Sequence, residues 1–147
     1  MIRIFQNEDL EQVIQIWLRT NIQAHPFIPP DYWQGHYETV KEMLPQSELY
    51  VWEESGQIQG FIGLNDGYIC GIFVQQDAQS RGIGKKLLDH VKALKSGLTL
   101  HVYQKNSAAV RFYEREGFTT ESEGTDEDSG EKDYLMVWEH PSKRSML

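Results

Sequence analysis

The sequence predicts a mixed α/β fold, an α+β mixed sheet in which six to seven largely antiparallel strands are flanked by about four helices. Short segments with alternating apolar residues are separated by turns, and four longer segments space their apolar residues along one helical face. The 147 residues contain no internal repeat and no long linker. We therefore expect one domain over residues 1–140 and a flexible tail over residues 141–147.

The first third of the chain predicts one strand and two helices. Residues 2–5 alternate as a short strand, and Asn7 is placed to cap the first helix. Prolines between residues 26 and 30 then interrupt helical structure. Asp31 can cap a second helix, with Gln34 closing a capping box, and this helix ends near the next proline. The apolar face of the first helix holds Leu10, Val13, Ile14, Trp17 and Leu18.

The middle of the chain predicts three consecutive strands and a third helix. Strands are expected over residues 49–53, 57–64 and 68–74, because each segment is apolar and turn residues divide them. An amphipathic helix follows the glycine-containing segment 79–86. Its buried face is predicted to hold Ile83, Leu87, Val91 and Leu94, with Leu88 beside them.

The last third predicts a fourth helix between strands. Asn106 or Ser107 can cap this helix, and Gly117 terminates it. Residues 121–131 are acidic and contain glycine, which indicates a flexible hairpin loop. The other elements expected here are a strand at residues 98–103, a helix end near Glu116, a strand from Phe118 and a last strand at residues 133–139.

Composition excludes several classes of function. The net charge of −8 argues against general nucleic-acid binding, which needs a basic face, and is compatible with a cationic substrate. The single cysteine, Cys70, excludes a disulfide framework and favours a reducing compartment, so we expect a cytoplasmic protein. No N-terminal stretch has the pattern of a signal peptide or membrane span. We expect no nucleic-acid, membrane or metal partner, and either a monomer or a homodimer.

The segment 79–86, Gln-Ser-Arg-Gly-Ile-Gly-Lys-Lys, carries the strongest functional signal. A glycine-rich turn that enters a helix presents bare backbone N–H groups and the positive end of the helix dipole, and this arrangement binds phosphate. A Walker loop would need glycine at position 79 and Ser or Thr at position 86, where Gln79 and Lys86 stand. A dinucleotide loop would need a third glycine in place of Leu87. Both alternatives are therefore excluded.

Two motifs together resemble the GCN5-related N-acetyltransferase (GNAT) family. Gln79, Gly82 and Gly84 match Gln/Arg-x-x-Gly-x-Gly/Ala, the acetyl-CoA loop of that family. Residues 106–118 match its second signature, Asn-x-x-Ala-x-x-Phe-Tyr-x-x-x-Gly-Phe. The resemblance covers residues 51–118 and implies a GNAT-like fold, with a sheet that splays between its fourth and fifth strands. Further likeness to the bacterial YiaC/YjaB-type branch of the family, which implies a protein-lysine acceptor, lies in residues 25–28, 32–33, 51–54 and 102–106.

The resemblance implies a binding site for acetyl-CoA. Backbone N–H groups at the end of the fourth strand would hold the pantetheine arm and polarise the thioester carbonyl. The loop glycines let the backbone approach the pyrophosphate, and Asn106 would cap its helix, bond the pantetheine amide, or do both. The residues predicted to bind acetyl-CoA are Ile72, Phe73, Val74, Gln79, Ser80, Arg81, Gly82, Ile83, Gly84, Lys85, Asn106, Ala109 and Tyr113.

Tyr113 is the predicted general acid. A phenol with a pKa of about 10 keeps its proton at neutral pH and can donate it to a departing thiolate, while the adjacent Phe112 is expected to pack in the core. His101 is the predicted base, acting directly or through water, at a position where related N-terminal acetyltransferases carry glutamate. A histidine satisfied by its neighbours explains that position equally well. Direct transfer needs no nucleophile, so we interpret Cys70 as a buried small residue.

The acceptor pocket is expected between the first two helices and the fourth strand. Asp66 or the acidic segment 121–131 could attract a lysine, although such a loop is usually only solvated. The predicted function is acetyl transfer from acetyl-CoA to a primary amine, a protein lysine by the resemblance. The alternatives are a non-catalytic acyl-CoA-binding sensor and an acetyltransferase of a small-molecule amine. The predicted pocket wall holds His25, Phe27, Tyr32, Trp33 and Tyr68, although ordinary packing accounts equally well for Trp33.

Overall fold

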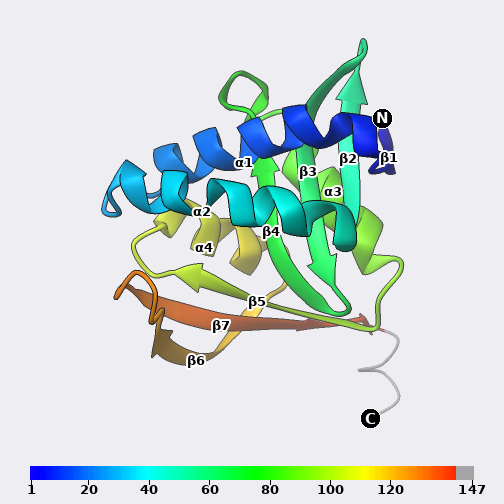
Figure 1. The fold of residues 1–147 in the computed structure, drawn as a ribbon. Helices are drawn as coiled ribbons and strands as arrows, with labels where there is room; N and C mark the ends of the chain where they lie inside the picture. The colour runs from blue at the N-terminus through cyan, green and yellow to red at the C-terminus, as the bar shows by residue number, and fades with distance from the viewer. Residues whose placement is uncertain (142–147) are drawn as a thin grey trace.

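One mixed sheet of seven strands organises the described part of the chain, residues 1–141 of the computed structural model (Figure 1). The strand order is β1-β2-β3-β4-β5-β7-β6, and every neighbouring pair is antiparallel except β4 with β5. The predicted fold class is therefore confirmed. The strands are β1 (Ile2–Ile4), β2 (Glu48–Glu54), β3 (Gln57–Asn65), β4 (Tyr68–Val74), β5 (Gly97–Tyr103), β6 (Thr119–Thr125) and β7 (Lys132–Glu139).

Helices cover both faces of the sheet. Figure 1 shows α1 and α2 together on the near face, with α3 behind the strands. Helix α1 packs against β3 and β4, whereas α3 packs against β2, β3 and β4 and α4 packs against β5. Among residues 1–141 no helix is long and apolar enough to cross a membrane. The helices are α1 (Leu10–Ala24), α2 (Pro30–Met43), α3 (Ile83–Lys92) and α4 (Ser107–Arg115), with short 3-10 turns at Asn7–Asp9, Leu44–Gln46 and Gln76–Ala78.

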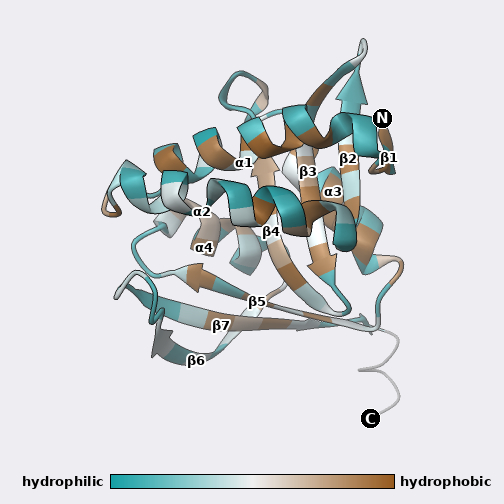
Figure 2. Ribbon diagram, in the orientation of Figure 1, coloured by the Kyte–Doolittle hydropathy of each residue, from teal (hydrophilic) through white to brown (hydrophobic). Residues whose placement is uncertain are grey.

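Two apolar clusters, one on each face, hold these layers together. Strand β3 contributes to both, because Phe61 belongs to the α1/α2 cluster and Ile62 to the α3/α4 cluster. Full burial of such a side chain contributes about 1.5–3 kcal/mol. Figure 2 shows the result: the covered strands β3 and β4 are mainly hydrophobic, while α1 and α2 mix hydrophobic and hydrophilic residues along each turn. The central strands therefore have apolar residues on both faces, as expected for strands covered on both sides.

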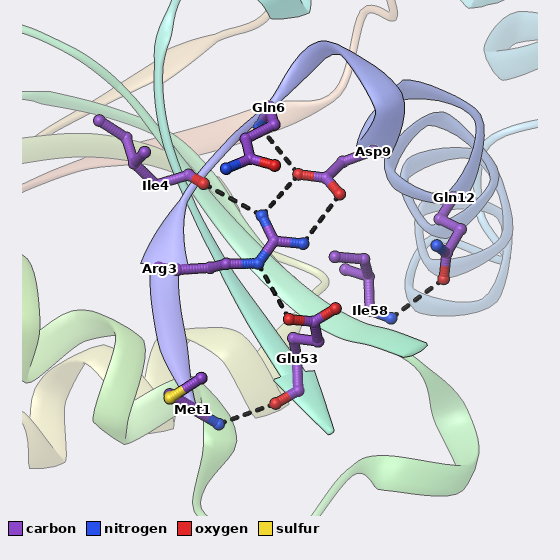
Figure 3. A network of polar contacts seen from close by, with 8 residues as sticks. All are labelled: Met1, Arg3, Ile4, Gln6, Asp9, Gln12, Glu53 and Ile58. Carbon is purple, nitrogen blue, oxygen red and sulfur yellow. Dashed lines mark hydrogen bonds and ion pairs between the residues drawn. The ribbon is translucent and has the colours of Figure 1, made fainter. Parts of the chain in front are cut away.

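A partly buried ionic network joins the N-terminal strand to the start of the first helix and to β2 (Figure 3). The Arg3 guanidinium donates two hydrogen bonds to the buried Asp9 carboxylate, at 2.8 and 2.9 Å, and one to Glu53 at 3.0 Å. The Gln6 backbone N–H donates to the same Asp9 carboxylate at 2.8 Å. The hydrogen bonds from Arg3 hold the pKa of Asp9 below its usual value. The helix start is therefore organised by Asp9.

Several local predictions need correction. Asn7 begins a 3-10 turn instead of capping α1, and Asp31 makes no cap because Pro30 occupies the first turn of α2. Leu94 lies beyond the end of α3 and is 53% exposed. Residues 121–125 belong to β6, so the predicted hairpin loop shortens to the segment between β6 and β7. Residues 142–147, most of the predicted tail, lie outside the described residues.

Candidate active site

Strands β4 and β5 separate soon after they meet, and this separation opens the site. Their one registered pair within the described chain is Tyr68 with Thr99, beside a hydrogen bond from the Thr99 backbone N–H to the Gly67 carbonyl at 2.9 Å. Beyond that pair, the β5-facing edge of β4 has no ladder partner. A cavity of about 660 Å³ occupies the gap. Its walls include Ile72 and Phe73 from β4, as the predicted splay requires.

A β-bulge in β4 turns Cys70 out of the core. Gly63 pairs with Gly71 but the next residue, Leu64, pairs with Ile69, so Cys70 is the extra residue of the bulge. Its thiol is exposed and lines the cavity, which overturns the prediction of a buried residue. Partial desolvation by the cavity walls raises the pKa of this thiol. A thiol held in its protonated form is a weak nucleophile, which agrees with a reaction that does not use it.

The glycine loop presents a row of backbone N–H donors at the start of α3. Ser80 and Gly82 adopt left-handed conformations, with φ of 65° and 81°. The first helical hydrogen bond is donated by the Lys86 N–H to the Gly82 carbonyl at 3.0 Å. Within residues 1–141, the backbone N–H groups of residues 80–85 donate no hydrogen bond. This row of donors at a helix N-terminus suits a phosphate group.

The polar side chains of the loop contact the protein itself. The Gln79 amide donates to the Val74 carbonyl at 2.9 Å and so braces the loop against the end of β4. Arg81 pairs with Glu54 at 3.0 Å, and Lys85 pairs with Glu116 at 3.0 Å. Both cations are exposed, so these pairs are weak enough for a phosphate to compete for them. The loop itself does not line the β4–β5 cavity, and β4 connects the two features.

Helix α4 places Tyr113 in the wall of the cavity. Asn106 caps this helix as predicted, since its side-chain oxygen accepts a hydrogen bond from the Ala109 N–H at 3.2 Å. Tyr113 is 8% exposed, and its hydroxyl makes no hydrogen bond to any residue that the structure describes. Burial raises the pKa of this phenol above its ordinary value. Phe112 was expected to be the core residue, but it is only partly buried, and Tyr113 belongs to the core cluster.

Tyr68 and His101 form a hydrogen-bonded pair across the opening. The Tyr68 hydroxyl lies 2.9 Å from His101 Nδ1, and both side chains line the cavity. Burial raises the pKa of the Tyr68 phenol, so it stays protonated near neutral pH. His101 is exposed to the cavity, and its Nε2 has no hydrogen-bond partner in residues 1–141. The predicted base and a predicted acceptor residue are thus adjacent.

His25 connects the acceptor side of the cavity to α4. Its Nδ1 donates to the Asn21 carbonyl at 3.0 Å, and its Nε2 accepts from the Asn106 amide at 3.3 Å. The imidazole stacks on Trp33, with ring centroids 5.2 Å apart. Burial lowers the pKa of His25, which favours the neutral form that this pattern of donor and acceptor requires. His25, which was predicted to line the acceptor pocket, is therefore hydrogen-bonded to Asn106, which was predicted to bind the cofactor.

The remaining predicted wall residues divide into two groups. Trp33 lines the cavity, whereas Phe27 and Tyr32 are absent from its lining. Phe27 instead packs edge-on against His25, with centroids 5.6 Å apart, and Tyr32 packs edge-on against Trp33 at 4.9 Å. These two rings support the wall from behind.

The residues predicted to bind acetyl-CoA also divide into two groups. Those outside the cavity lining are Val74, Gln79 and the loop residues to Lys85. Those within it are Ile72, Phe73, Asn106, Ala109 and Tyr113.

The cavity also contains Asp126, from the predicted acidic segment 121–131, and Tyr103 and Asp133, which the sequence did not single out. Tyr103 donates its hydroxyl to Asp126 at 2.6 Å, and Ser129 donates to the same carboxylate at 2.8 Å. Although burial acts to raise it, these hydrogen bonds keep the pKa of Asp126 below its usual value. Asp133, opposite Tyr103 in the β5–β7 pairing, is buried in the same cavity. A polar residue at a strand position was the only available signal for Asp133.

Comparison with known proteins agrees with this geometry. The family model described as acetyltransferase (GNAT) domain matches residues 23–139. The peptidyl-lysine N-acetyltransferase YiaC of Escherichia coli strain K12 is 34% identical over 94% of this chain and 96% of its own. The solution structure of apo YjaB from Escherichia coli superposes with a TM-score of 0.83 at 26% identity, covering 94% of this chain and 96% of that one. The fold is also that of yncA from Salmonella typhimurium, solved with its cofactor acetyl-CoA, with a TM-score of 0.67 at 18% identity over 95% of this chain and 92% of that chain.

Proposed function

Because the chain belongs to the GNAT family of acetyltransferases, we propose that it transfers the acetyl group of acetyl-CoA directly to a lysine side chain of a protein. Acetyl-CoA is the acetyl donor of this family. YiaC and YjaB carry the name peptidyl-lysine N-acetyltransferase, which supports a lysine acceptor here. The single cysteine favours a cytoplasmic location, which belongs to the same proposal.

The observation that carries the proposal is that two rows of backbone groups, one at each end of the site, make no hydrogen bond or ladder pair within residues 1–141. The N–H groups of residues 80–85 would bind the pyrophosphate, and the unpaired edge of β4 would bind the pantetheine arm and the thioester oxygen. Asn106 and Ala109, at the start of α4, would complete the wall along that arm. Bound acetyl-CoA supplies the thioester, whose C–S bond breaks as the amine nitrogen bonds to the acetyl carbon.

Tyr113 would hold the proton needed by the leaving thiolate. Its phenol lines the cavity, has no hydrogen-bond partner among the described residues and has a raised pKa, so it reaches the reaction protonated. A general acid placed in this way contributes about 10²- to 10⁴-fold to a rate.

His101 would take the proton that the acceptor ammonium must lose. In the tautomer with the proton on Nδ1, that N–H donates to the Tyr68 oxygen and leaves Nε2 as the base. The Tyr68 contact then fixes the orientation of the ring. The proton passes from the amine to Nε2, directly or through one water, before the nitrogen attacks.

Mass spectrometry of a mixed library tests the acceptor class. Lysine peptides, α-amino peptides, polyamines and small amines are incubated with the protein and acetyl-CoA, and acetylated products are counted. We expect a mass increase on lysine side chains. Acetylation confined to polyamines or small amines would instead establish a small-molecule acetyltransferase and contradict the lysine proposal.

A further inference from the structure

One carboxylate in the cavity wall has no hydrogen-bond or ion-pair partner among residues 1–141. Asp133 is 9% exposed and lines the cavity, and its side chain makes no hydrogen bond or ion pair to any residue between 1 and 141. The other buried aspartate, Asp9, shows the usual arrangement, with hydrogen bonds from Arg3 and from the Gln6 backbone. The Asp133 oxygens are not among the fully buried side-chain atoms that lack a partner within residues 1–141, so they open onto the cavity. The contacts of the described chain therefore leave this carboxylate free to bind a ligand from the cavity.

The surroundings of Asp133 leave it open to a ligand from the cavity. Tyr103 lies opposite it on β5, but the Tyr103 hydroxyl is committed to Asp126. On β6 its partner is Gly124, where an added Cβ would come within 3.2 Å of Asp133 Oδ1. The absence of a side chain at Gly124 gives the carboxylate room on that side.

The charged side chains of the cavity wall near Asp133 are all acidic. Asp126, Glu127 and Asp128, from the segment between β6 and β7, line the same cavity, and no lysine or arginine of the described chain does so. Glu127 and Asp128 are exposed, and Asp126 already accepts two hydrogen bonds from neighbouring hydroxyls. The same residues form no cluster suited to a metal ion in residues 1–141. An organic cation is the ligand that this wall fits.

We propose that Asp133 binds the ammonium group of the acceptor, and that the carboxylates between β6 and β7 attract it toward the cavity. The inference rests on the proposed acetyl transfer, because a primary amine reaches the site as its ammonium form at neutral pH. Asp133 and His101 lie on the same face of neighbouring strands, two positions apart in register. The ammonium held by Asp133 is thus presented near the base that removes its proton. The ligand class is a side chain that ends in a primary ammonium.

Direct binding to the CoA-loaded protein tests the inference apart from catalysis. The probes are a lysine peptide and the same peptide with norleucine, which has a similar length and lacks the ammonium. Calorimetry should show the wild type binding the lysine peptide about 10- to 100-fold more tightly, the range for a hydrogen bond to a charged group. Asp133→Asn should reduce that preference to about 3-fold or less. The exposed Glu139, on the same strand but outside the cavity, provides the control Glu139→Gln, which should keep the full preference.

Two further measurements separate binding from a structural role. Asp133→Asn should unfold at about the same temperature as the wild type, because it removes no hydrogen bond or ion pair of the side chain within residues 1–141. Gly124→Ala keeps the charge but crowds Asp133 Oδ1, and should give an intermediate loss of the lysine preference. A wild type that does not prefer lysine, or an Asp133→Asn protein that retains the preference, overturns the inference. Failure of the proposed function appears separately, as absence of acetylated lysine in the presence of normal peptide binding.

Discussion

The link between His25 and Asn106 is predicted to couple the acceptor wall to the cofactor helix. His25→Phe keeps a ring against Trp33 but removes the bond to Asn21 and the bond from Asn106. At about 0.5–1.5 kcal/mol each, loss of the two hydrogen bonds should lower the free energy of unfolding by about 1–3 kcal/mol. For a chain of this size, a loss of 2 kcal/mol lowers the unfolding temperature by about 4–8 °C.

A double-mutant cycle isolates the link. Thermal unfolding of His25→Phe, Asn106→Ala and the double variant should give a coupling energy of about 0.5–1.5 kcal/mol. His90→Phe paired with Asn106→Ala is the matched control, because His90 contacts Tyr50 instead and should add independently. Additive effects for His25 and Asn106, within about 0.3 kcal/mol, would refute the coupling.

The same histidine predicts a pH dependence. The folded-state pKa of His25 lies below its unfolded value because of burial, so the unfolded chain binds more protons between the two pKa values. The neutral ring therefore makes its full contribution to the free energy of unfolding when the pH is above the unfolded-state pKa of about 6.5. That contribution decreases as the pH falls from there through the folded-state pKa. Unfolding curves between pH 7.5 and 5 should show a smaller loss of stability for His25→Phe than for the wild type. Equal losses would contradict the assignment.

Three further predictions concern the loop, the bulge and the N-terminal network. Gly82→Ala forces a side chain into a left-handed backbone conformation, so it should lower the free energy of unfolding by about 1–2 kcal/mol and weaken CoA binding in calorimetry. Its control is Gly35→Ala, within α2 and free of contacts, which should raise the free energy of unfolding by about 0.5–1 kcal/mol. Equal effects of the two substitutions would contradict the loop geometry. Cys70→Ala should keep turnover within about 2-fold in a thiol-release assay, and a larger loss would assign the thiol a catalytic role. Arg3→Met leaves the buried Asp9 carboxylate without its cationic partner and should lower the free energy of unfolding by about 3 kcal/mol in denaturant titrations. An unchanged denaturation midpoint would rule out a stabilising network.

Local patterns in the sequence were sufficient for most of the fold. Strand β4 is observed with the predicted bounds, Tyr68–Val74, because its apolar run and flanking turns are local features. Asn106 caps α4 and Gly117 follows it with a φ of 95°, as their residue types suggested. The glycine loop was found in the same way, since its function depends on backbone geometry that nearby glycines determine.

The misplaced residues depend on contacts that are distant in the sequence. Cys70 was expected in the core because it lies within an apolar strand and direct transfer needs no nucleophile, but a bulge against β3 turns it outward. The proposed role of Asp133 could not be predicted because it depends on the pairing of β7 with β5 and β6, which places Tyr103 and Gly124 beside it. Phe27 was placed in the cavity wall because it is aromatic and lies in the connection between the first two helices, and its position behind His25 depends on the tertiary packing.

The central claim is that Tyr113 supplies the proton for the departing thiolate, and Tyr113→Phe tests it most directly. The substitution removes one oxygen that bonds to no residue of the described chain, so the fold and acetyl-CoA affinity should remain within about 2-fold of the wild type. Single-turnover measurements of acetyl transfer to a lysine peptide should show the chemical step slowed by about 100-fold or more. Retained acetyl-CoA binding with this slow step is the predicted result. A chemical step as fast as that of the wild type would contradict it.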